Sequence, residues 1–199
     1  MKSKGCLMAI GAVVLVVLAV AGWVMSTYNG LVTKQQAVEA QWAQVENVYQ
    51  RRADLVPNLV ATVKGYAKHE KQTLQDVTEA RTKATQIHID PSKLDEASLQ
   101  QFQQAQGQLG NALSRLLAVH EAYPDLKANA NFQTLQAQLE GTENRIAVER
   151  NKFNTVAQDY NVAIKRVPAS MLAGAFGFES KAYFEAQAGA DKAPTVSFD

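Results

Sequence analysis

The sequence predicts an all-α protein, in which an N-terminal transmembrane helix precedes an antiparallel up-down-up-down four-helix bundle and a short irregular C-terminal tail. Two observations predict this class. Residues 6–26 form an apolar run without a charged side chain, and from residue 28 apolar residues recur at alternating spacings of three and four, the heptad pattern of packed helices. No stretch before Pro168 is typical of a β-strand. The chain therefore divides into a tail, an anchor, a bundle domain and an irregular end, over residues 1–5, 6–26, 28–167 and 168–199.

The apolar run is long enough to cross a bilayer, since about 20 residues at ~1.5 Å each make a helix of about 30 Å. Lys2 and Lys4 precede it and the next basic residue is Lys34, so we expect the N-terminus in the cytoplasm and the bundle on the outer side. Residues 19–21, Ala-Val-Ala, fit a signal-peptide cleavage site, but the run continues beyond them, which favours an uncleaved anchor. Lipidation of Cys6 is disfavoured because a lipoprotein signal has its apolar region before the cysteine.

The first bundle helix is expected to continue the anchor, with Asn29-Gly30 as the one weak point between them. Its heptad seam starts at Tyr28 and extends to Val56. Pro57 then interrupts the pattern, because proline disfavours helical geometry in the residue before it. The sequence therefore predicts a tight reversal over residues 54–58.

Three further helices are expected, with seams over residues 59–87, 99–123 and 132–167. Ser92–Asp95 is a candidate capping box for the second of these, and Asn129 or Asn131 can cap the last. Pro124 and Pro168 end the last two helices. Short connections between helices of this length favour antiparallel neighbours.

This topology places two turns at the end of the bundle far from the membrane. Polar residues gather in both turns, and they form either a network that caps the bundle or a docking surface for another protein. These tip residues are Arg51, Arg52, Asp54, Asn58, Glu121, Tyr123 and Asp125. The tail after Pro168 returns to the membrane side, where its aromatic residues either cap the base of the bundle or contact lipid. They are Phe176, Phe178, Tyr183 and Phe184.

Composition and motifs give no sign of catalysis. The 20 basic residues balance the 19 acidic ones, so no global field favours nucleic acid. A di-metal site in a helical bundle needs Glu-x-x-His pairs, and none of the three histidines has a glutamate three residues before it. Cys6 is the only cysteine, and the serine-elbow and phosphate-loop motifs are absent. We expect no metal, no cofactor, no catalytic residue and no enzyme activity.

Several polar residues fall on the apolar seams, and buried polar groups of this kind fix the register of similar helices. They are Gln35, Arg52, Glu70, Gln106, His120 and Glu149.

Ordered motifs occur along nearly the whole chain. They are Tyr28-Asn29-x-Leu31-Val32, residues 49–59, 121–129 and 139–146, Tyr160-Asn161, Phe176-Gly-Phe178, Phe184 and Pro194-x-Val-x-Phe198. Together these motifs resemble the LemA family. The resemblance implies a bacterial membrane protein with one N-terminal transmembrane helix and a helical bundle, and it implies no enzyme activity or cofactor. The expected location is the bacterial inner membrane, with the bundle on the periplasmic side.

The leading functional hypothesis is a non-enzymatic, membrane-anchored scaffold or adaptor that binds an unidentified protein through its distal tip or its helix faces. The alternative is a membrane-shaping or lipid-associated protein that forms homo-oligomers and uses the aromatic tail as a second membrane contact. A sensory module is a third, less favoured hypothesis, because only five residues before Cys6 are left for a cytoplasmic output.

Overall fold

The computed structural model describes residues 2–67 and 69–185, and within them it contains helices and no strand. The all-α prediction is therefore confirmed. The helices are α1 (Lys2–Tyr66), α2 (Lys71–Gln86), α3 (Glu96–Ala118), α4 (Pro124–Lys127), α5 (Ala130–Lys165) and α6 (Ala169–Ala173), with 3₁₀ turns at Pro91–Lys93 and Val119–Ala122.

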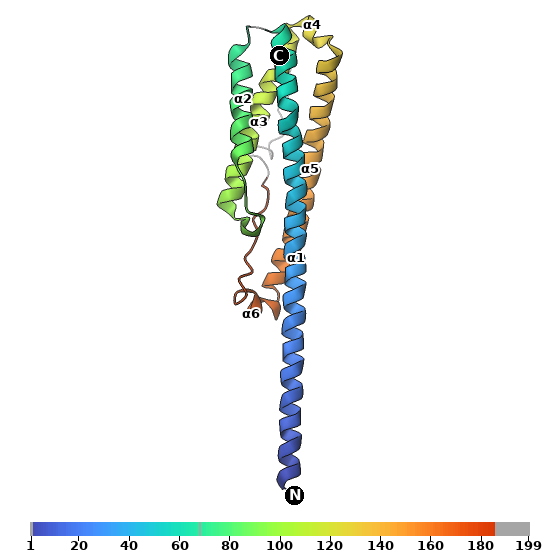
Figure 1. Cartoon of the computed structure of the whole chain (residues 1–199), viewed down its shortest axis with the longest axis vertical. Helices are drawn as coiled ribbons and strands as arrows, with labels where there is room; N and C mark the ends of the chain where they lie inside the picture. The colour runs from blue at the N-terminus through green and yellow to red at the C-terminus, as the bar shows by residue number, and fades with distance from the viewer. Residues whose placement is uncertain (1, 68, 186–199) are drawn as a thin grey trace, which may run out of the picture.

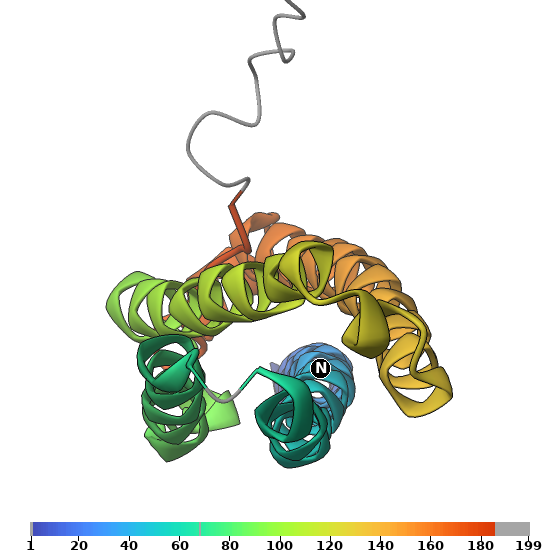
Figure 2. The same ribbon diagram turned by 90° about the horizontal axis from the view of Figure 1, so that it is seen from above.

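The molecule is a long rod in which only part of α1 is covered by other helices (Figure 1). The N-terminal part of α1 projects alone, while its C-terminal part packs with α2, α3 and α5. In the view from above, α3 and α5 form one side and α1 and α2 the other (Figure 2). Of the described helices, α1 alone is long and apolar enough to cross a membrane, and its most apolar segment is not covered by any other part of the described chain.

The predicted reversal at residues 54–58 is wrong, because α1 runs through Pro57 and ends at Tyr66. Proline has no N–H, so the carbonyl of Ala53 loses its partner within the helix. Arg81 of α2 replaces that partner, with its Nε donating to the Ala53 oxygen at 2.9 Å. A side chain from another helix thus compensates for the proline, and the chain reverses only after Tyr66. Gly30 also lies inside α1.

The helices α2 and α3 are shorter than their apolar seams suggested, whereas α5 has the expected length. The second helix begins at Lys71 rather than near residue 59. The helix α3 is capped by Asp95, whose carboxylate accepts from the Ser98 N–H at 2.7 Å, so a cap at Ser92 is not formed there. The cap predicted at Asn129 is confirmed, since its side chain accepts from the Phe132 N–H at 2.9 Å.

The core nearer the uncovered N-terminal part of α1 is built around Trp42, which is 0% exposed. Its ring lies 5.2 Å from Phe102 of α3, 5.6 Å from Phe153 of α5 and 6.0 Å from Phe184 of the tail. One side chain of α1 therefore joins three other parts of the chain. The tail, expected to be irregular, supplies a core residue.

Two asparagines of α5 hold the tail in an extended conformation. The Asn161 side chain accepts from the Lys181 N–H and donates to the Lys181 carbonyl, both at 2.8 Å. Asn154 pairs in the same way with Phe184, at 2.8 and 2.9 Å. The two asparagines are seven helical residues apart, a rise of ~10.5 Å, and their partners are three extended residues apart, a span of ~10 Å. The two hydrogen-bonded pairs, which clamp the tail, are therefore spaced to match.

The clamped tail also contacts the segment that precedes α3. The Ala182 N–H donates to the Leu94 carbonyl at 3.0 Å, and the Lys181 ammonium donates to the Ser92 carbonyl. Burial lowers the pKa of the Lys181 amine, and nearby carboxylates only partly offset this. The tail therefore fills the space between α5 and the start of α3, at the end nearer the uncovered part of α1.

Replacing Asn161 by leucine is expected to lower the free energy of unfolding by about 1–3 kcal/mol, because the buried N–H and C=O of Lys181 would lose their partners. The same change should speed tryptic cleavage after Lys181, which is 5% exposed in the folded chain. Asn151 on the same helix is exposed and is the matched control. Equal cleavage rates in the two variants would contradict the clamp.

Candidate functional site: a groove between α3 and α5

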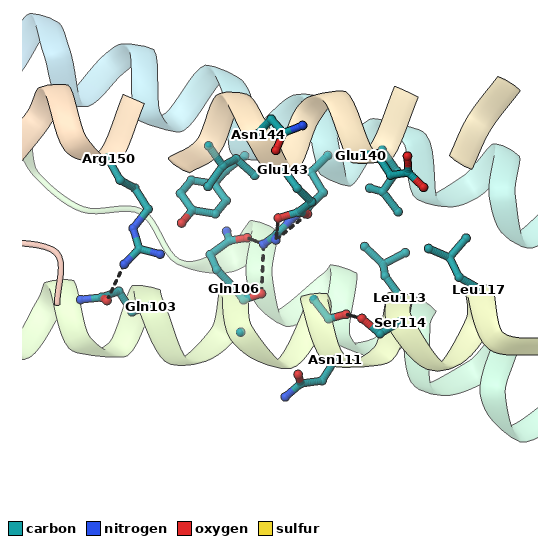
Figure 3. A pocket seen from close by; sticks show the side chains of 16 residues that line it. Gln103, Gln106, Asn111, Leu113, Ser114, Leu117, Glu140, Glu143, Asn144 and Arg150 are labelled. Atoms are coloured by element: carbon teal, nitrogen blue, oxygen red, sulfur yellow. Dashed lines mark hydrogen bonds and ion pairs between the residues drawn. The ribbon is translucent and has the colours of Figure 1, made fainter. Parts of the chain in front are cut away.

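Beyond the clamped tail, the space between α3 and α5 is open and forms a groove of about 610 Å³ (Figure 3). The walls come from α3 and α5, and α1 provides the floor. Ten of the sixteen lining residues are polar, and six of these ten are uncharged. The lining residues are Tyr49, Arg52, Gln103, Gln106, Gly107, Gly110, Asn111, Leu113, Ser114, Leu117, Leu139, Glu140, Glu143, Asn144, Ile146 and Arg150.

Arg52 lies at the floor of the groove and is 4% exposed. Its Nη1 donates to the Glu143 carboxylate of α5 at 3.1 Å. Its Nη2 donates to the backbone carbonyl of Gln106 at 3.0 Å and to the side-chain oxygen of Gln106 at 2.5 Å. The guanidinium also lies 5.0 Å from the centre of the Tyr49 ring. One buried cation therefore links α1 to both walls.

The groove stays open partly because α3 has glycines on the side that faces it. Apart from its chain neighbours and the nearby backbone of its own helix, a Cβ at Gly107 would meet no described atom within 4 Å, and one at Gly110 would meet only Arg52 Nη1, at 3.8 Å. Glycine in a helix interior costs about 0.5–1 kcal/mol relative to alanine. These two glycines leave empty space beside Arg52 that larger residues would fill.

Arg150 closes the end of the groove that lies nearer the tail. Its Nη2 donates to the Glu185 carbonyl at 2.8 Å and lies 3.5 Å from the Gln103 side-chain oxygen. The guanidinium stacks over Phe184 at 4.9 Å. The groove therefore begins where the described part of the tail ends, so the two occupy consecutive parts of one gap.

The groove presents hydrogen-bonding groups whose positions are fixed by the surrounding helices. Burial raises the pKa of the Tyr49 phenol above its ordinary value, so this group stays protonated at neutral pH. The described residues contain no cluster of three or more potential metal ligands. What the groove offers is a fixed cation with its carboxylate partner and amide side chains that both donate and accept hydrogen bonds.

The structure separates the seven predicted tip residues. Because α1 continues beyond Pro57, Arg51, Asp54 and Asn58 lie on the exposed surface of that helix, and Arg52 lies in the groove. The remaining three belong to the distal connection around α4, and they are Glu121, Tyr123 and Asp125.

At the distal end, some of the residues that join the two turns lie outside the predicted set of seven. The Tyr123 hydroxyl donates to the Glu70 carboxylate at 3.3 Å, and Asn129 donates to the Tyr66 hydroxyl at 2.8 Å. The single seven-residue cluster expected at the tip is therefore not formed.

The four aromatic residues predicted to cap the base of the bundle or to contact lipid also lie in different environments. Phe184 is 6% exposed and belongs to the core, so membrane contact is wrong for this residue. Tyr183 is partly exposed and its hydroxyl accepts from Asn161 at 2.8 Å. Phe178 is half-buried, with its ring 5.7 Å from Tyr28, and Phe176 is exposed, with its ring 5.1 Å from Tyr28.

Sequence reasoning identified only part of the groove. Arg52 and Gln106 were singled out as polar residues on apolar seams, and they are in fact hydrogen-bonded to each other. Glu143 was missed because it lies outside the seam of its helix. The signal available in the sequence was the pair Gly107 and Gly110 inside a glutamine-rich helical segment.

The model of the LemA family matches residues 41–198, which include the groove and the tail. The chain belongs to the LemA family. Among curated proteins, it is 29% identical over 196 residues to the magnetosome proteins MamQ 1 and MamQ 2 of Paramagnetospirillum magneticum, covering 89% of this chain and 72% of each relative. It is 22% identical over 158 residues to protein LemA of Metamycoplasma hominis, covering 79% of this chain and 68% of that protein.

Proposed function

We propose that this LemA-family chain is a non-enzymatic, membrane-anchored adaptor that holds an extended segment of a partner protein in the groove between α3 and α5. The apolar part of α1 serves as the anchor in a bacterial inner membrane, with the N-terminus in the cytoplasm and the helices in the periplasm. Residue 52 follows residue 26 by 26 helical residues, so the partner is held about 39 Å from the bilayer.

One observation carries this proposal. The membrane-proximal part of the same gap already holds an extended chain, and side chains of α5 bind it through backbone hydrogen bonds from Asn154, Asn161 and Arg150. The unfilled part is lined by side chains of the same chemistry, Gln103, Asn111 and Asn144. Amides of this kind pair with the N–H and C=O of any extended segment, which favours a peptide as the occupant.

The two glycines of α3 give a way to fill the groove without damaging the fold. Changing Gly107 to glutamine places a long side chain where no described atom lies within 4 Å of the new Cβ. Because glutamine is a better helix former, stability should stay the same or rise by about 0.5–1 kcal/mol. Gly141→Gln on α5 is the matched control, since Gly141 has the same open surroundings and is absent from the groove lining.

The measurement is quantitative mass spectrometry of proteins that co-purify with the full chain from solubilised membranes. We expect at least one protein to be strongly depleted by Gly107→Gln and retained by Gly141→Gln and by the unchanged chain. An identical set of co-purified proteins in all three samples would contradict the proposal that the groove is the binding surface.

The names of the relatives favour a second candidate function. Two of the three described above are named magnetosome proteins. The second candidate is that the chain shapes or associates with a membrane as a homo-oligomer. This candidate predicts that the full chain recovers a tagged copy of itself from membranes. Recovery of monomer alone at native expression levels would argue against it.

A further inference from the structure

The helix α6 lies beside α1 at the base of the packed helices, next to the part of α1 that projects alone (Figure 1). Four large apolar residues in this region are exposed. Val167 is 79% exposed, Met171 75%, Phe176 48% and Tyr28 40%. We call these four residues the basal face. Isolated exposed apolar residues are ordinary on a protein surface, but several of them at one end of a fold favour a contact surface. Two of the four, Tyr28 and Phe176, are in direct contact.

The basal face is continuous with the segment of α1 that is apolar enough to cross a membrane. Tyr28 follows residue 26 by about 3 Å of helix rise, so it lies at the end of the apolar run. The Phe176 ring is 5.1 Å from the Tyr28 ring, which fixes the α6 region at the same level. Aromatic rings at this level are typical of the interface between lipid headgroups and hydrocarbon.

The basal face is held rigidly, so its exposure is a feature of the fold. Ala173 of α6 is 4% exposed and packs in the same core cluster as Leu31 of α1. The Phe178 N–H donates to the Ala173 carbonyl at 2.9 Å, and Gly177 adopts a positive φ of 74° that turns the chain back toward α5. The buried side of α6 thus orients Met171 outward.

The charges around the basal face do not oppose a lipid surface. Lys165 and Arg166 lie at the end of α5, and Glu179 follows the turn after α6; all three are exposed. The local balance is therefore slightly positive, which suits zwitterionic and anionic headgroups alike.

We propose that the basal face docks on the lipid surface of the same bilayer that α1 crosses. A second contact beside the anchor restricts tilting of the rod, so the groove is held at a defined height above the membrane. The inference rests on the membrane anchoring in the proposed function, and it does not depend on what occupies the groove.

The test measures lipid proximity at single labelled positions in the full chain. Cys6 is changed to serine, and one cysteine is introduced at Met171, Val148 or Met25 and labelled with an environment-sensitive fluorophore. Each protein is reconstituted at low density into phosphatidylcholine and phosphatidylglycerol vesicles that contain nitroxide-labelled lipid. Val148 is the matched control, since it is 50% exposed but lies on α5 above the basal face, and Met25 reports the anchor.

We expect the label at residue 171 to be quenched about as strongly as the label at residue 25, and several-fold more than the label at residue 148. Quenching at 171 no stronger than at 148, with strong quenching at 25, would overturn the inference and leave the anchor intact. Absence of quenching at residue 25 would overturn the anchoring and the inference with it. The fluorophore at residue 171 could also report an apolar environment that becomes polar when excess lipid dilutes the protein. That result would assign the basal face to a second copy of the chain and overturn the inference.

Discussion

Replacing Trp42 by alanine is expected to lower the free energy of unfolding by about 3–5 kcal/mol, the largest effect of any single substitution considered. The indole is 0% exposed and its ring lies against Phe102, Phe153 and Phe184. Its removal would leave a cavity at the point where α1, α3, α5 and the tail meet. Cavities of this size in a helical core are only partly closed by relaxation.

The loss is measured by urea unfolding of the full chain in detergent micelles, followed by helical circular dichroism. Trp23→Ala is the control, since Trp23 lies in the apolar part of α1 and is 39% exposed. We expect the control to leave the transition of the packed helices unchanged. Equal midpoints for the two variants would contradict a core centred on Trp42.

Replacing Arg52 by methionine is expected to lower the free energy of unfolding by about 2–4 kcal/mol. The carbonyl and side-chain oxygens of Gln106 would lose their donor inside the protein. The cost falls below that of a fully buried ion pair because the Glu143 side chain is 46% exposed and can be solvated. The substitution should also release α3 from α5 along the groove.

The same unfolding experiment, with Arg51→Met as control, tests this prediction. Arg51 is the neighbouring residue and is exposed, so its substitution should change stability by no more than about 0.5 kcal/mol. The double variant Arg52→Met with Glu143→Gln should cost less than the sum of the two single changes. Strict additivity would mean that the ion pair does not couple α1 to α5.

Local sequence patterns were sufficient to predict much of the fold. The predictions that were wrong concern features that depend on contacts between residues distant in the sequence. Helical periodicity and the side chain of Asn129 depend on neighbours within one or two turns, so they could be interpreted directly. The continuation of α1 through Pro57 depends on Arg81, which donates from another helix to the carbonyl of Ala53 that the proline leaves without a partner. No local pattern contains that hydrogen bond.

The groove and the tail were missed for a related reason. Periodicity tells which side of a helix is apolar, but it does not tell which helices lie side by side or how far apart. The separation of α3 from α5 depends on the tail, whose Phe184 enters the core while Asn154 and Asn161 hold its backbone. Arg52 and Gln106 were recognisable as unusual, but their partnership required the arrangement in space.

Photo-crosslinking in intact cells tests the central proposal, that the groove binds a partner protein, most directly. A benzophenone amino acid is placed at Asn144 on the groove wall or, as control, at its exposed neighbour Arg145, which is outside the lining. The proposal predicts a discrete adduct with one other protein from residue 144, lost in the Gly107→Gln background, and none from residue 145. The same adducts from both positions, or an adduct confined to the chain's own residues 186–199, would contradict it.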